Sequence, residues 1–95
     1  MGSDMRLIYI LWSTWESLGV LVYRREIQLD LLEDFFSGPV IVTWLRLRRC
    51  VDEYRAKTER DTMGEWWQWL AERMMERERG GAPPPANVEF RDWTP

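Results

Sequence analysis

The segment from Arg6 to Tyr23 is apolar around nearly its whole helical circumference, and this pattern constrains the fold more than any other feature of the chain. Such a helix is stable in water only when other surfaces cover most of it. The sequence therefore predicts a first helix that is buried on all sides. Its apolar residues are Leu7, Ile8, Ile10, Leu11, Trp12, Trp15, Leu18, Val20, Leu21 and Val22.

The same segment raises the question of a membrane span or a secretory leader. A span needs about 20 predominantly apolar residues, and a leader places its apolar run between a basic region and a cleavage site of small residues. Glu16 lies in the middle of the run and argues against both interpretations. We expect a cytoplasmic protein, with a membrane-associated first helix as the alternative.

Two more helices are predicted between residues 27 and 58. The segment Ile27–Phe36 places acidic and apolar side chains at helical spacing. Ser37-Gly38-Pro39 is expected to end that helix and to begin the next, because Pro is favoured at the first helical position. The next helix then runs from Pro39 to about Thr58, and its apolar stripe contains Val40, Trp44, Leu47, Val51 and Tyr54, with Ile41 on the flank.

A fourth helix is predicted after Thr62. Thr62 and Glu65 have the spacing of a capping box, in which each side chain accepts a hydrogen bond from the backbone N–H of the other residue. The helix ends by Gly80-Gly81, and its apolar arc contains Met63, Trp66, Trp67, Leu70 and Met74, widened by Trp69. The predicted fold is therefore an all-α, four-helix domain over residues 1–79.

The two ends of the chain are interpreted separately from this domain. Residues 1–4 resemble an expression scar ahead of Met5 and are left out of the fold argument. Residues 80–95 contain three consecutive prolines and are predicted to form an extended or disordered tail. Its apolar residues Val88, Phe90 and Trp93 order it only if they dock on the domain.

The absence of His and the single Cys50 remove most routes to catalysis. His is the usual acid or base at neutral pH and the commonest metal ligand, and zinc sites need several thiolates or imidazoles. Glu72 and Glu76 lie one helical turn apart, but on the solvated face, and the di-iron pattern requires a His three residues after a Glu. We therefore predict no enzymatic activity, no catalytic residue, no metal and no cofactor.

Glu16 is the most informative charged residue, because a carboxylate in an apolar helix must be paired, neutralised or placed at an interface. Arg48 and Arg55 are seven residues apart and share one edge of the apolar stripe of residues 39–58. Either guanidinium could bind the carboxylate with two hydrogen bonds. The favoured interpretation is a buried ion pair that sets the helix register, and the alternative is a pocket for a small anionic or polar ligand.

The charge distribution argues against nucleic-acid binding. The chain has 13 basic and 16 acidic residues, and its Arg-rich run from Arg46 to Arg60 is interleaved with carboxylates at helical i, i+4 spacing. Backbone recognition of nucleic acid needs an uncompensated basic surface.

Self-association is the economical explanation for an apolar surface larger than four short helices can hide. The chain has seven Trp residues, and aromatic side chains at helical spacing are usually core or interface. We therefore predict a homodimer, with an unidentified protein partner as an open alternative. The expected interface residues are Leu7, Leu11, Trp12, Trp15, Leu18 and Trp69.

The order of these features resembles a family of small, mostly bacterial and phage proteins known only as a domain of unknown function. The resemblance covers about residues 11–75 and implies no activity, while an N-terminal membrane helix in many members leaves membrane attachment open. The matching features are Glu16-Ser17-Leu18-Gly19, the segment Leu29–Phe36, Gly38, Trp44, Arg55 and the segment Trp66–Leu70.

The resulting hypothesis is a Trp-rich, non-enzymatic interaction module that forms homo-oligomers. Two alternatives stay open: a membrane-proximal module anchored by its first helix, and a regulator that binds a small ligand or nucleic acid.

Overall fold

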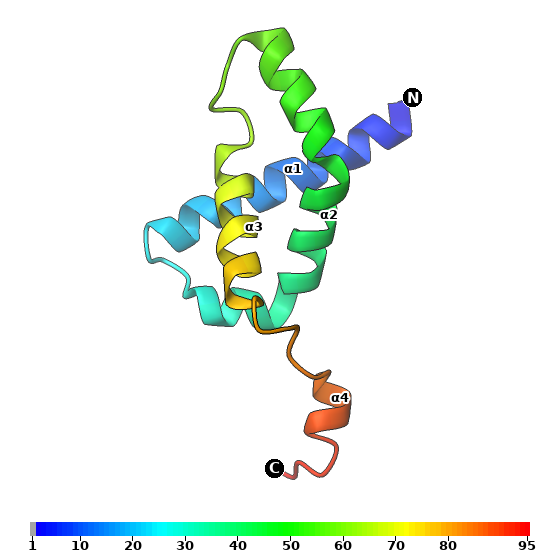
Figure 1. Cartoon of the computed structure of the whole chain (residues 1–95), viewed down its shortest axis with the longest axis vertical. Coiled ribbons are helices and arrows are strands. Elements are labelled where there is room, and N and C mark those ends of the chain that lie inside the picture. Colours follow the sequence, from blue (N-terminus) through cyan, green and yellow to red (C-terminus); the bar gives the residue numbers. More distant parts are fainter. Residues whose placement is uncertain (1) are drawn as a thin grey trace.

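The computed structural model describes the backbone of residues 2–95 and the side chains from Met5 onward. This part of the chain contains helices and no strand, which confirms the predicted all-α class (Figure 1). The helices are α1 (Gly2–Tyr23), α2 (Leu29–Thr58), α3 (Glu65–Arg77) and the four-residue α4 (Ala86–Glu89). Because α1 begins at Gly2, residues 2–4 continue that helix instead of preceding the fold.

The core is built around α3, which packs against both α1 and α2 (Figure 1). Its residues Trp67, Leu70, Ala71 and Met74 are completely buried. Full burial of one large apolar side chain contributes about 1.5–3 kcal/mol, so this short helix supplies much of the stabilisation. The other two helices contribute Trp15 and Val22 from α1 and Leu32, Val40, Trp44 and Val51 from α2.

The predicted break at residues 37–39 is wrong, because α2 continues through Pro39. A proline inside a helix removes one backbone hydrogen bond and pushes the preceding turn aside, which bends a helix more often than it ends one when both sides are held by packing. Leu32 and Val40 anchor α2 to the core on either side of the bend. Figure 1 shows the start of α2 (cyan) running in a different direction from its remainder (green).

The prediction that the first helix is buried on all sides is also wrong for a single copy of the chain. One face of α1 packs on the core through Leu11, Trp15 and Val22. Its remaining surface stays exposed, because α2 and α3 approach from one side only. The exposed apolar residues of α1 are Met5, Leu7, Tyr9, Ile10, Leu21 and Tyr23.

The segment after α3 leads away from the three packed helices (Figure 1). It contains α4, which the sequence did not predict, and residues 79–95 are all exposed. Val88, Phe90 and Trp93 therefore do not dock on the core.

Candidate functional site

Glu16 caps the N-terminus of α3 from a different helix. Its Oε1 accepts a hydrogen bond of 2.8 Å from the backbone N–H of Trp67. The first N–H groups of a helix have no partners within the helix and carry partial positive charge, so a carboxylate at this place is favourable. Gly64 is the N-cap residue of α3 and offers no side chain of its own for this role.

Two glycines let the backbones come close enough for this contact. Gly19 lies one turn after Glu16, and a Cβ atom there would be 2.9 Å from the carbonyl carbon of Trp66 and closer still to its oxygen. Gly64 has a φ of +73°, which favours glycine, and a Cβ atom there would be 2.9 Å from Cγ1 of Val51. The close approach of α1 and α3 therefore depends on Gly19, and the entry into α3 depends on Gly64.

The environment of Glu16 raises the pKa of its carboxyl above the ordinary value. Removal from water is the largest cause, because it disfavours the charged form. The backbone N–H groups of Trp67 and Trp66 lower the pKa, Glu65 raises it through its charge, and Arg55 lowers it least. Desolvation thus outweighs the helix N-terminus, and the carboxylate stands in a site that would favour a further positive partner.

The predicted ion pair between Glu16 and Arg48 or Arg55 is not formed in the described part of the chain. Arg48 is exposed. The Nε of Arg55 instead donates a 2.7 Å hydrogen bond to the carbonyl oxygen of Met63, which holds the loop between α2 and α3. Sequence spacing predicts that both arginines lie on one edge of a helix. It does not predict the direction from which Glu16 approaches that helix.

The predicted capping box is wrong as well. No side chain of Thr62 or Glu65 caps α3, although the backbone N–H of Glu65 does donate to the carbonyl oxygen of Thr62 at 3.2 Å. Glu16, which lies 49 positions before Glu65 in the chain, caps α3 instead. The helix α3 begins at Glu65, two residues later than the start predicted directly after Thr62, and its capping partner Glu16 could be found only in three dimensions.

The raised pKa of Glu16 predicts a pH-dependent stability. The folded state holds the Glu16 proton more tightly than the unfolded state, so this favourable contribution is complete below the unfolded pKa of about 4.3 and is lost as pH rises through the folded pKa. Glu16→Gln stays neutral, and its amide oxygen can still accept from Trp67. The urea midpoint of the wild type should fall relative to that of E16Q as the pH rises above about 4.

The control for this measurement is Glu89→Gln, which changes an exposed carboxylate in α4. E89Q should follow the wild-type pH dependence. A constant difference between the wild type and E16Q across the pH range would contradict the assignment.

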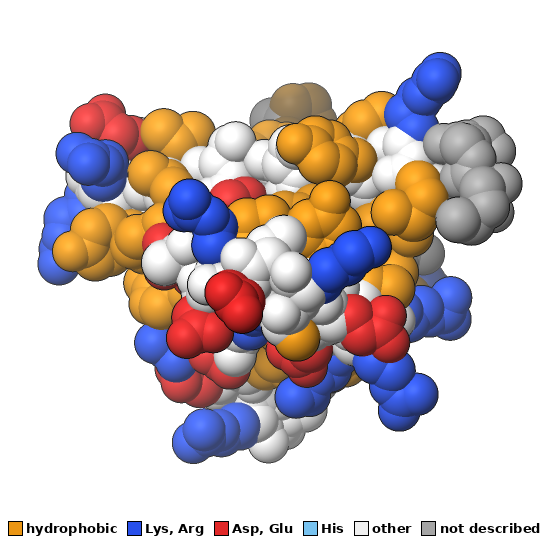
Figure 2. Space-filling view, turned by 90° about the horizontal axis from the view of Figure 1, so that it is seen from above, with side chains coloured by type: hydrophobic (Ala, Val, Ile, Leu, Met, Phe, Trp, Pro, Cys, Tyr) orange, Lys and Arg blue, Asp and Glu red, His pale blue; other side chains and the backbone are white. Residues whose placement is uncertain are grey.

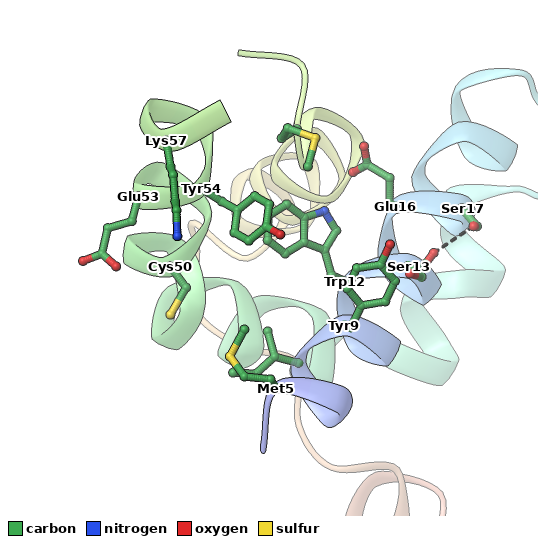
Figure 3. A pocket seen from close by; sticks show the side chains of 12 residues that line it. Met5, Tyr9, Trp12, Ser13, Glu16, Ser17, Cys50, Glu53, Tyr54 and Lys57 are labelled. Carbon is green, nitrogen blue, oxygen red and sulfur yellow. Dashed lines mark hydrogen bonds between the residues drawn. The ribbon is translucent and has the colours of Figure 1, made fainter. Parts of the chain in front are cut away.

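A cavity of about 590 Å³ opens between α1 and the C-terminal half of α2, next to Glu16. Figure 2 shows that apolar side chains are exposed over much of the upper part of the face seen in that view. The close-up in Figure 3 shows Tyr9, Trp12, Ser13, Glu16 and Ser17 on α1 and Cys50, Glu53, Tyr54 and Lys57 on α2. Met5, Ile8 and Met63 complete the lining.

Aromatic rings form much of the cavity wall. Trp12 packs edge-on against Tyr54, with ring centroids 5.7 Å apart, and its other neighbour is the buried Trp67 at 6.1 Å. The sequence placed Tyr54 in the core and Trp12 at a subunit interface, and it did not single out Tyr9. The helical spacing of Met5, Tyr9, Trp12 and Glu16 shows that they share one face of α1. The sequence does not show that the C-terminal half of α2 lies opposite this face and closes the cavity.

The structure places the predicted interface residues in different environments. Trp15 is buried in the core, Leu11 and Leu18 are partly covered, and Trp12 lines the cavity. Trp69 packs on Tyr23 near the end of α1, and Tyr23 lies about 24 Å along the helix from the exposed Leu7. Leu7 and Trp69 therefore lie near opposite ends of α1.

The described residues contain neither a metal-binding cluster nor a membrane-spanning helix. No group of His, Cys, Asp and Glu side chains is arranged to hold a metal ion. No helix in this part of the chain combines the length and the apolar character that crossing a bilayer requires.

Comparison with known proteins agrees with the resemblance found in the sequence. A family model described as a domain of unknown function (DUF4760) matches residues 3–74, which include all of α2, most of α1 and most of α3. No curated protein and no solved structure matches the chain.

Proposed function

The chain belongs to the DUF4760 family, which supplies no activity, and we propose from the geometry that it is a non-enzymatic interaction module that pairs two copies through α1. The observation that carries the proposal is an exposed apolar stripe beside the core-facing side of that helix. Leu7 is 58% exposed, Ile10 55% and Leu21 36%. The partly covered Leu18 belongs to the same stripe.

The spacing of the stripe is symmetric about Thr14. Ile10 and Leu18 lie four residues to either side, and Leu7 and Leu21 lie seven residues to either side. In an antiparallel pair of identical helices, residues equally far before and after the twofold axis lie opposite each other. Leu7 would then meet Leu21 of the second copy, and Ile10 would meet Leu18, so the stripe is complementary to itself.

The centre of the stripe can enter an interface without leaving a polar group unpaired. The hydroxyl of Thr14 donates a 2.7 Å hydrogen bond to the carbonyl oxygen of Ile10 in its own helix. Because that donor is already satisfied, covering Thr14 avoids the cost of a lost hydrogen bond. The small side chain also permits the 8–10 Å separation of axes that is typical of packed helices.

Disulfide trapping tests this arrangement. In a Cys50→Ser background, Thr14→Cys should give a covalent dimer under mild oxidation, since residues on the twofold axis come within the Cα separation of about 4.4–6.8 Å that a disulfide needs. The matched control is Ser13→Cys, which is also exposed but lies about 100° further around α1. The readout is the fraction of dimer on a non-reducing gel.

Light scattering on the wild type supplies the second measurement. We expect a dimer that Leu7→Glu converts to a monomer, because a charge opposite Leu21 would be desolvated without a partner. Equal trapping at positions 13 and 14, or a wild type that stays monomeric at about 100 µM, would overturn the proposal. A monomer that binds lipid vesicles through the same stripe would favour the membrane-proximal alternative instead.

A further inference from the structure

We propose that the cavity between α1 and α2 binds a small organic amine, with its apolar body against the aromatic wall and its ammonium group at Glu16. The inference concerns a different face of α1 from the Leu7–Leu21 stripe and does not depend on pairing of two copies. The volume of the cavity, about 590 Å³, lies within the range of about 300–1,000 Å³ that is usual for small-molecule sites.

The aromatic rings favour a positively charged ligand. Tyr9, Trp12 and Tyr54 line the same cavity from two helices, and Figure 3 shows their rings grouped around it. The face of an aromatic ring attracts a cation within about 6 Å, and Trp does so most strongly. Tyr9 is 71% exposed and Tyr54 42%, so their rings are available to a ligand.

Glu16 supplies the negative charge that would bind the ammonium group. Its carboxylate is half-buried, its Oε1 is bound by the backbone of α3, and no Lys or Arg in the described residues forms an ion pair with it. An ammonium group at this position would compensate the removal of the carboxylate from water. The gain is larger than at a solvated carboxylate, because attraction between charges strengthens as water is excluded.

The alternative of an acidic ligand at Lys57 is weaker. Lys57 is an exposed residue in the last turn of α2, across the cavity from Glu16 (Figure 3). Ion pairs at such exposed positions contribute little. Glu53 lies one turn before Lys57 on the same wall, and its negative charge further disfavours an anion.

Three ligands of matched size separate these possibilities: 2-phenylethylammonium, the neutral 2-phenylethanol and the anionic phenylacetate. Each is titrated at neutral pH into the protein of residues 1–95, and binding is followed by the indole N–H signals in NMR spectra. We expect the amine to bind at least tenfold more tightly than the alcohol, and the acid more weakly than both.

Two variants assign the contacts. Glu16→Gln retains an acceptor for the N–H of Trp67 but loses the charge, and it should reduce the preference for the amine over the alcohol by about tenfold. Tyr9→Ala removes an exposed ring of the wall and should weaken amine binding several-fold without lowering the urea midpoint. Tyr23→Ala, which removes an exposed ring of α1 outside the cavity, should leave binding unchanged.

The proposal is overturned if the alcohol or the acid binds as tightly as the amine, or if none of the three ligands shifts a resonance at millimolar concentration. It is also overturned if E16Q retains the full preference for the amine. Repeating the titration on the Leu7→Glu variant separates this result from the outcome for dimerisation.

Discussion

Replacing Trp67 with Ala is expected to lower the free energy of unfolding by about 3–5 kcal/mol. Trp67 is completely buried at the centre of the molecule, with its ring 5.5 Å from that of Trp44 and 6.1 Å from that of Trp12. Truncation leaves a cavity between all three long helices, which cannot collapse without moving α1 and α2 together. A domain of this size typically has a total stability of only about 5–15 kcal/mol, so W67A should be close to unfolded at 37 °C.

Urea denaturation followed by far-ultraviolet circular dichroism measures this effect without relying on Trp fluorescence. The matched control is Trp93→Ala, because Trp93 is 70% exposed in the segment that leads away from the core. W93A should change the free energy of unfolding by less than about 0.5 kcal/mol. Similar losses in both variants would contradict the placement of the two side chains.

The second large effect is expected for Gly19→Ala, which should destabilise the protein by about 2–3 kcal/mol. The added Cβ would overlap the backbone of Trp66, and a backbone atom cannot rotate out of the way as a side chain can. The two helices must then separate, which also withdraws Glu16 from the N-terminus of α3. This loss outweighs the gain of roughly 1 kcal/mol that Ala normally brings over Gly inside a helix.

Gly38→Ala is the matched control for that prediction, since it makes the same change inside α2. Apart from its two chain neighbours, a Cβ atom at Gly38 would meet no atom within 4 Å, so only local effects should act. These are the helix preference for Ala and the crowding of a Cβ against the ring of the following Pro39, and they have opposite signs. Because these two effects oppose each other, G38A is expected to change the free energy of unfolding by less than about 1 kcal/mol. If G19A were neutral or stabilising as well, the close contact between α1 and Trp66 would be wrong.

Hydrophobic spacing was a reliable guide wherever burial decided the structure. The stripe of α2 was predicted through Val40, Trp44 and Val51, all of which are buried. The arc of α3 was predicted in the same way, and Trp67, Leu70 and Met74 are its innermost residues. Local periodicity suffices for these residues because each helix has only one side on which it can avoid water.

Local signals failed where residues far apart in the sequence compete with them. Pro39 has the sequence context of a helix start, but packing on both sides carries α2 through it. Thr62 and Glu65 have the spacing of a capping box, but Glu16 takes over the N–H groups of α3. In both cases a tertiary contact outweighs a local preference worth about one hydrogen bond.

The run of apolar residues from Arg6 to Tyr23 by itself determined that the protein has a first helix with more apolar surface than its own chain can cover. The sequence alone also shows that the protein has no His and therefore lacks the usual acid or base at neutral pH. Only the tertiary structure decided which face of that helix is covered, that Glu16 points at α3 and not at an arginine, and that a cavity opens beside it. These features depend on the angles and distances between α1, α2 and α3, which are set by the packing of the three helices together. The hydrophobic spacing within one helix carries no information about them.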